Sequence, residues 1–152
     1  MSYSYFALLS RMKYINRWAL MRNAREENLS EHCLEVAILT HALCVIGNKK
    51  WNKNLSVEKA VLRALYHTEE FGKVFFPEDY ATLSYENKLI KAADKLSALI
   101  KCEEELRAGN QEFSTAAMST RKKVEEMAEE LPELKCFMED FLPEYGKPLD
   151  EL

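Results

Sequence analysis

Apolar residues recur at intervals of three and four along most of this chain, and few residues interrupt the pattern. That spacing places apolar side chains on one face of an α-helix. A half-buried strand would need strict alternation of apolar and polar residues, which we do not find. Only four glycines and four prolines occur among 152 residues, so turns are few and helices can be long. The sequence therefore predicts an all-α fold.

The helical signals have recognisable ends. Ser30 and Ser56 are suited to cap helices, because a serine hydroxyl accepts a hydrogen bond from a first-turn N–H. Gly47 and Gly109 are typical C-terminal stops, and Pro132 suits a first turn. We expect helices over residues 3–17, 30–46, 56–67, 85–108, 112–130 and 132–141. Residues 16–25 and 68–83 lack a clean period and are predicted to be loops, the second with aromatic residues tucked into the core.

Two of these helices should form the centre of the core. The expected buried side chains on residues 30–46 and 85–108 are Leu34, Ala37, Ile38, Ala42, Val45, Leu89, Ala93, Leu96, Leu99 and Ile100. A length of 152 residues fits one ordinary domain, so we expect a single helical domain over residues 1–152. A hydrophobic share of 47% with 30% charged residues is typical of a globular chain.

Charge, cysteines and apolar runs exclude several classes of function. Residues 1–67 hold ten Lys and Arg against five Asp and Glu, but the net charge of the chain is −4, which argues against a nucleic-acid polymer as partner. The four cysteines form no Cys-x-x-Cys pair and are expected to be reduced core residues. No run of about 18 apolar residues and no signal-like start are visible, so we expect a cytoplasmic protein without a membrane span.

Three residues far apart in the sequence have the chemistry of a metal site. His32 begins one apolar helix, His67 ends the next, and Asp94 stands beside the apolar stripe of the longest helix. Two imidazoles and a carboxylate suit a first-row divalent ion, and three packed helices can bring them together. Spacing does not establish this, because isolated histidines are more often ordinary polar residues. A buried carboxylate without a partner is costly, which favours a partner for Asp94.

Six stretches resemble the bacterial HD-domain 5'-deoxynucleotidases. They are LSRMKYINRW at 9–18, LMRN at 20–23, ENLSEH at 27–32, ALYH at 64–67, AADKLSALIKC at 92–102 and ELRAGNQEF at 105–113. The resemblance implies an all-helical, metal-dependent and dimeric phosphohydrolase that acts on deoxyribonucleoside 5'-monophosphates. By position, it makes His32, His67 and Asp94 metal ligands. It places Arg17 on the phosphate as a catalytic and substrate-binding residue, and Trp18 beside the nucleoside. The ion would be Co²⁺, Mn²⁺, Mg²⁺ or Zn²⁺.

One departure from that pattern is specific. The family has a His-Asp doublet where this chain has His67-Thr68, and residues 69–77 resemble sequence well downstream of the doublet. The resemblance therefore implies that an internal segment is excised at 67/68, with the doublet carboxylate and the acidic residues that act on the attacking water. Three explanations fit: a deletion, a degenerate paralogue, or a segment that these 152 residues leave out. If the chain is complete, we expect weak metal binding and slow or no hydrolysis.

Two other hypotheses about function fit the same residues. A degenerate helical dimer or nucleotide-binding protein without catalysis would follow from Thr68 and the missing segment. An HD-type triphosphohydrolase or cyclic-nucleotide enzyme would use a similar ligand set, although the Arg17-Trp18 context resembles the monophosphate enzymes.

Overall fold

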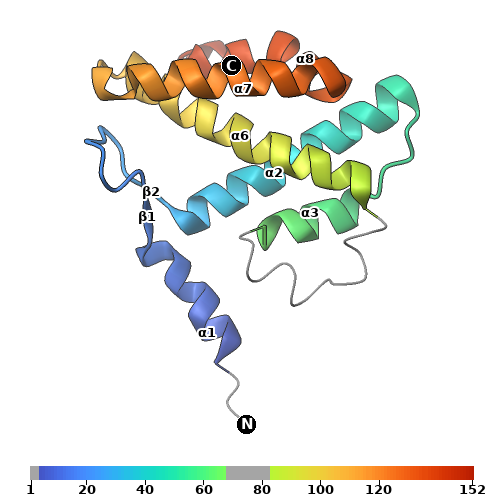
Figure 1. Cartoon of the computed structure of the whole chain (residues 1–152), viewed down its shortest axis with the longest axis horizontal. Coiled ribbons are helices and arrows are strands. Elements are labelled where there is room, and N and C mark those ends of the chain that lie inside the picture. Colours follow the sequence, from blue (N-terminus) through green and yellow to red (C-terminus); the bar gives the residue numbers. More distant parts are fainter. Residues whose placement is uncertain (1–3, 68–82) are drawn as a thin grey trace.

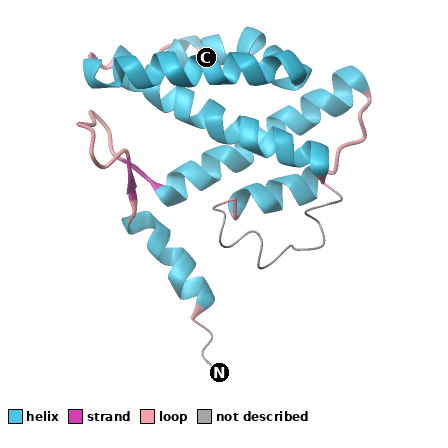
Figure 2. Cartoon of the chain, viewed as in Figure 1, coloured by secondary structure: helices cyan, strands magenta, loops and turns pink. Residues whose placement is uncertain are grey.

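A computed structural model describes residues 4–67 and 83–152 of the chain. Two long helices, α2 (Leu29–Trp51) and α6 (Ser84–Arg107), cross at the centre of the molecule (Figure 1). Helix α3 (Val57–Leu65) packs on α2, whereas α7 (Ser114–Glu130) packs on α6 and α8 (Pro132–Asp140) touches α2 and α7. Helices account for most of the described residues (Figure 2). The predicted all-α fold is confirmed.

The N-terminal segment differs from its prediction. Helix α1 (Tyr5–Ser10) passes into a 3-10 turn at Arg11–Tyr14, so the expected helix over residues 3–17 ends early. Strands β1 (Asn16–Arg17) and β2 (Glu27–Asn28) then pair antiparallel, with Arg17 opposite Glu27. The expected loop over 16–25 is thus the connection of a small hairpin, whose two-residue strands are too short to show alternation in the sequence.

Helix α2 begins and ends at other residues than expected. Its N-cap is Asn28, not Ser30. The Asn28 side chain accepts from the Glu31 N–H, and Glu31 accepts from the Asn28 N–H in return. Such reciprocal bonds satisfy two first-turn donors and outweigh the preference for serine. The C-cap is Asn52, in the left-handed conformation at φ 51°.

Gly47 lies inside α2, where it serves a close approach instead of a helix end. A Cβ at this position would lie 2.8 Å from Glu133 Oε1 and 2.9 Å from Leu55 Cδ1. Glu133 is fully buried and paired with Lys53, so it has little freedom to move away. The glycine is therefore required by the packing of α8 against α2.

Only part of the predicted face of α2 is buried: Ala37 lies in the core as expected. Leu34 and Ile38 are 57% and 58% exposed, whereas Val36, Leu39 and Leu43 are buried. This helix is apolar almost all round, so periodicity does not identify the face that α3 and α6 cover. It is also long and apolar enough to cross a bilayer by length and composition, a criterion that core helices meet as well.

The remaining elements follow the predictions closely. Helices α3, α6, α7 and α8 begin and end within about two residues of expectation, apart from the 3-10 turn Gln111–Phe113 before α7. All four cysteines are buried and free. The expected aromatic loop lies outside the described residues, except for Leu83 at its end. The core between α2, α3, α6, α7 and α8 includes Leu39, Leu43, Ala60, Ala64, Leu89, Leu96, Leu99, Val124, Leu134 and Phe137.

Candidate metal centre and adjoining pocket

His32, His67 and Asp94 come together where α2, the end of α3 and α6 meet. Their ligand atoms all lie within 4.8 Å of one another. Asp94 Oδ1 is 2.7 Å from His32 Nε2 and 3.5 Å from His67 Nε2. His32 is fully buried, and the His67 and Asp94 side chains are 13% and 31% exposed. Two imidazole nitrogens and a carboxylate oxygen at this spacing form a donor set that fits one divalent ion.

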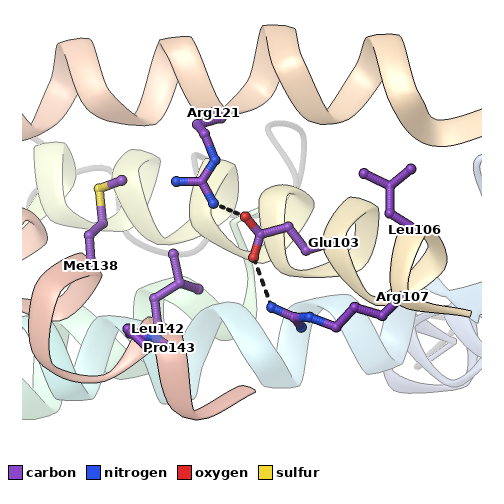
Figure 3. A pocket seen from close by; sticks show the side chains of 7 residues that line it. All are labelled: Glu103, Leu106, Arg107, Arg121, Met138, Leu142 and Pro143. Carbon is purple, nitrogen blue, oxygen red and sulfur yellow. Dashed lines mark hydrogen bonds and ion pairs between the residues drawn. The ribbon is translucent and has the colours of Figure 1, made fainter. Parts of the chain in front are cut away.

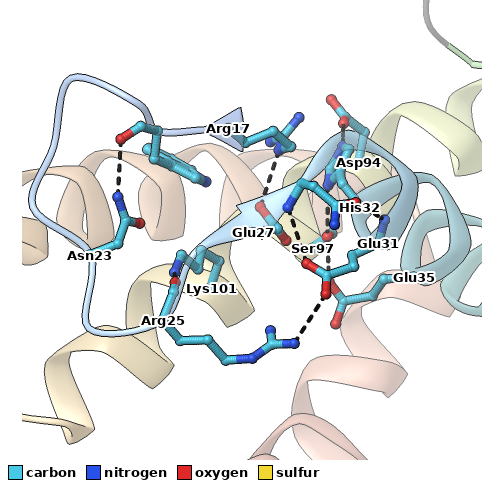
Figure 4. A network of polar contacts seen from close by, with 12 residues as sticks. Arg17, Asn23, Arg25, Glu27, Glu31, His32, Glu35, Asp94, Ser97 and Lys101 are labelled. Atoms are coloured by element: carbon cyan, nitrogen blue, oxygen red, sulfur yellow. Dashed lines mark hydrogen bonds and ion pairs between the residues drawn. The ribbon is translucent and has the colours of Figure 1, made fainter. Parts of the chain in front are cut away.

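Each histidine uses its second nitrogen to fix the ring. His67 Nδ1 donates to the backbone carbonyl of Ala64 at 2.7 Å, one turn back at the end of α3. His32 Nδ1 lies 3.1 Å from Ser97 Oγ, and Ser97 in turn donates to Glu35 at 2.6 Å (Figure 4). Sequence reasoning missed Ser97 and Glu35, because a serine and a glutamate on helices carry no signal of their own. Both Nε2 atoms consequently face Asp94.

The protonation of this group is set by burial and by the shared carboxylate. Burial lowers the pKa of His32, and its hydrogen bond with Asp94 does not offset that effect. Burial also lowers the pKa of His67, but bonds to Asp94 and Cys33 outweigh it and raise the pKa to about 10. Burial raises the pKa of Asp94, yet the two histidines hold it well below its usual range. Asp94 is therefore an anion, as a metal ligand must be.

Arg17 is placed beside the centre by the hairpin. Its guanidinium Nε donates to Glu27 at 3.1 Å across β1 and β2, and the Glu27 side chain is 8% exposed (Figure 4). One carboxylate oxygen of Glu27 thus orients the guanidinium and leaves its remaining N–H groups for another acceptor. Glu27 was not identified from the sequence, because its role depends on the strand register.

Trp18 occupies a constrained turn directly after Arg17. Its φ of 57° is unusual for a bulky side chain. The Trp18 carbonyl accepts from the Met21 N–H at 2.9 Å and from the Asn23 side chain at 3.1 Å, which holds the turn. The indole packs on Phe113 with ring centroids 5.5 Å apart. Strain of this kind tends to occur at functional sites.

Arg17, Trp18 and Asp94 share one pocket of about 370 Å³. Helices α6 and α7 form its other wall, where cationic and hydroxyl side chains gather. The lining on that side consists of Lys95, Ala98, Ser119, Thr120 and Lys123. The structure thus brings the expected phosphate, nucleoside and metal residues to one place, with His32 and His67 behind Asp94. The α7 residues were not expected from the sequence.

A buried ion pair anchors the loop that carries Trp18. Glu105 is 2% exposed and accepts from the backbone N–H groups of Ala24 and Arg25 at 2.8 and 3.1 Å. It also pairs with Lys101, which donates to the Arg25 carbonyl. Burial raises the pKa of Glu105, but bonds from Lys101, Asn110 and the two N–H groups outweigh it and lower the pKa to about 2.

We expect Glu105→Ala to lower the free energy of unfolding by about 3–5 kcal/mol, because Lys101 would stay buried without its anion. Since the folded-state pKa is depressed, this stability is present above about 4.5 and is lost as pH falls toward about 2. Denaturant unfolding at several pH values measures both effects. Glu104→Ala, which removes an exposed neighbouring carboxylate, is the matched control. Equal stabilities of the two variants at pH 7 would contradict the expectation.

A second pocket, of about 400 Å³, lies away from the centre, between α6, α7 and the 3-10 turn Leu142–Gly146 that follows α8 (Figure 3). Glu103 there binds both Arg107, at 3.3 Å, and Arg121. The carboxylate therefore already engages both cations of this pocket. None of the residues that line this second pocket belongs to the His32, His67 and Asp94 group.

Known proteins resemble this chain over nearly all of its length. A family model described as 5'-deoxynucleotidase YfbR-like matches residues 4–74 and 68–145. Relatives named 5'-deoxynucleotidase YfbR, from Shigella dysenteriae serotype 1 (strain Sd197) and Escherichia coli (strain K12 / DH10B), are 37% identical over 190 residues. That match covers 97% of this chain and 94% of each relative. Because 190 aligned positions exceed 152 residues, at least 38 positions of the relatives have no counterpart here.

The fold is shared with a solved structure. A crystal structure of an HD-domain phosphohydrolase (lin2634) from Listeria innocua matches with a TM-score of 0.75 at 16% identity, covering 98% of this chain and 91% of that one. At this identity the match shows the fold. The sequence matches show that this chain belongs to the 5'-deoxynucleotidase YfbR-like family.

Proposed function

We propose that this chain hydrolyses deoxyribonucleoside 5'-monophosphates to the deoxynucleoside and phosphate, with one divalent ion held by His32, His67 and Asp94. The observation that supports this most is the shared pocket, in which Arg17 and Asp94 line one cavity beside two oriented histidines. The relatives named 5'-deoxynucleotidase supply the substrate class. A nucleotide is therefore the expected small-molecule partner, in place of a nucleic-acid polymer or a membrane.

Each residue has a distinct task in this proposal. When bound, the ion polarises phosphoryl oxygens and lowers the pKa of a bound water. His32 and His67 contribute imidazole nitrogens, His67 after losing the proton that its raised pKa retains, and Asp94 contributes the anion that balances the ion's charge. Arg17 catalyses by binding the non-bridging phosphate oxygens through its free N–H groups, as charge develops on them. Trp18 presents its ring to the nucleoside. Imidazole donors favour Zn²⁺ or Co²⁺, although Mn²⁺ and Mg²⁺ remain candidates.

We infer that the residues missing relative to the relatives follow His67. The two family-model matches both use residues 68–74, as expected if a segment between two halves of the pattern is absent. Thr68 then stands where the resemblance has the doublet aspartate. Three protein ligands can hold a catalytic zinc, so metal binding survives this loss. If the acidic residues that act on the attacking water belong to the missing segment, turnover should be slow.

A phosphate-release assay tests the function. Purified protein whose intact mass agrees with 17.7 kDa is incubated with dAMP and with Co²⁺, Mn²⁺, Zn²⁺ or Mg²⁺ in turn. We expect slow release that depends on the added ion and stops with a chelator. A ribonucleotide, AMP, tests the preference for the deoxy sugar. Absence of ion-dependent release with every metal would instead support a non-catalytic nucleotide-binding dimer.

We also propose that the protein is a single-domain homodimer in the cytoplasm. Helix α1 has no buried residue, and its Phe6 and Leu8 are 71% and 55% exposed. Leu34 and Ile38 form an exposed apolar patch on α2. Apolar side chains of this number and size favour contact with a second copy. Light scattering after size-exclusion chromatography measures the mass in solution, and a monomer at micromolar concentration would contradict the proposal.

A further inference from the structure

His32 is fixed by a chain of two side chains that the proposed reaction does not use directly. Both His32 and Ser97 are 0% exposed, at the crossing of α2 and α6. His32 Nδ1 lies 3.1 Å from Ser97 Oγ, and Ser97 Oγ donates to Glu35 Oε2 at 2.6 Å. Glu35 is half-buried and stands three residues after His32 on the same helix. In Figure 4, His32, Ser97 and Glu35 point toward one another below Asp94.

The direction of these bonds decides where the imidazole proton lies. A serine hydroxyl has one proton, and Ser97 gives it to the Glu35 carboxylate. Its oxygen is then available to accept from His32, so a proton on Nδ1 has an acceptor when Nε2 binds an ion. An ion bound at the centre needs the lone pair of Nε2. Without an ion, Nε2 lies 2.7 Å from the Asp94 carboxylate and donates to it, so the ion takes the place of that proton. A ring protonated at Nε2 would have no lone pair there for an ion.

We propose that Glu35 and Ser97 are positioning residues that stabilise the Nδ1-protonated form of His32, the form in which Nε2 binds the metal. The inference rests on the metal site of the proposed function. His67 is held in the same way by the Ala64 carbonyl, a backbone group that no side-chain substitution removes. The Glu35–Ser97 pair is therefore the part of this arrangement that can be changed experimentally. Hydrogen-bond partners of metal-binding histidines commonly change metal affinity by about 10–100-fold.

The test measures metal affinity in three variants. Co²⁺ is titrated into the wild type, Ser97→Ala, Glu35→Gln and the double variant, and visible absorption reports binding and ligand geometry. We expect each single substitution to weaken Co²⁺ binding by about 10–100-fold. Circular dichroism and thermal unfolding confirm that each variant is folded. Glu58→Gln, which removes an exposed carboxylate from α3, is the control for net charge and should bind Co²⁺ as the wild type does.

The double variant separates a hydrogen-bond relay from simple charge attraction. If Glu35 acts through Ser97, then Glu35→Gln has no further effect once Ser97 is alanine, and the effects are not additive. If Glu35 acts by its charge, the two losses add. In the Zn²⁺-loaded wild type, nitrogen NMR of labelled histidines should show His32 protonated at Nδ1 and bound through Nε2. Additive losses, wild-type affinity of the variants, or binding through Nδ1 would each overturn the inference.

Failure of this inference differs from failure of the proposed function. If the wild type binds Co²⁺ and the relay variants bind more weakly, the positioning role stands even when no phosphate is released. If the wild type releases phosphate and the variants bind Co²⁺ equally well, only the positioning role falls. If the wild type binds no ion, both proposals fall.

Discussion

Asp94→Asn is expected to weaken metal binding by at least about 100-fold. Loss of a metal ligand should lower metal affinity more than loss of a residue that only hydrogen-bonds to a ligand, which costs about 10–100-fold. Asp94 is the one carboxylate of the three-residue group, and its Oδ1 meets both histidines. The amide oxygen of asparagine is neutral, so the two remaining imidazoles would face the ion without an anionic ligand. Phosphate release from dAMP should fall to the level seen with chelator.

Asp140→Asn is the matched control for this change. Asp140 is on α8, its side chain is 56% exposed, and its pair with Lys50 spans 3.2 Å. The same chemical substitution there should leave Co²⁺ affinity and phosphate release unchanged. Thermal unfolding shows whether D94N remains folded, which is expected because the Asp94 side chain is already 31% exposed. A folded D94N protein with wild-type Co²⁺ affinity would exclude Asp94 as a ligand.

The fold was predictable where each helix has one clear apolar face. The stripe on α6 that includes Leu89, Leu96 and Leu99 is fully buried, as periodicity predicts. Periodicity failed on α2, because Leu34 and Ile38 belong to a helix that is apolar on several faces. Tertiary packing selects which face is covered there. In the same way, Gly47 is explained by Glu133 and Leu55, which are distant in sequence and invisible to local rules.

The candidate metal ligands were predictable from the sequence, but the contacts that orient them were not. Resemblance supplied His32, His67 and Asp94 as a set, and the structure brings them together, although their binding of an ion stays a prediction. The groups that orient them were not predictable. Ser97 reaches His32 only because α2 and α6 cross at that level. Glu27 reaches Arg17 only through the register of two-residue strands.

Arg17→Ala is expected to lower kcat/KM for dAMP by about 10²–10³-fold, the usual cost of losing a donor that stabilises charge in the transition state. Arg17→Lys should recover little of this, because an ammonium group cannot reproduce the planar fork of a guanidinium on phosphate. Co²⁺ affinity should stay at the wild-type value in both variants, since Arg17 provides no lone pair to an ion. That combination separates a phosphate-binding residue from one that maintains the metal centre.

The control for Arg17 is Arg22→Ala, in the loop that follows β1. The Arg22 side chain is 91% exposed, its partner is Glu112, and it does not line the pocket that contains Arg17 and Trp18. The Arg22→Ala substitution removes the same charge as Arg17→Ala and should leave kcat/KM and dAMP affinity unchanged. Because Arg17 also pairs with the buried Glu27, folding of each variant is checked by unfolding in denaturant. If folded Arg17→Ala protein kept wild-type kcat/KM, the phosphate would have to be held by other cations, of which Lys95 and Lys123 line the same pocket.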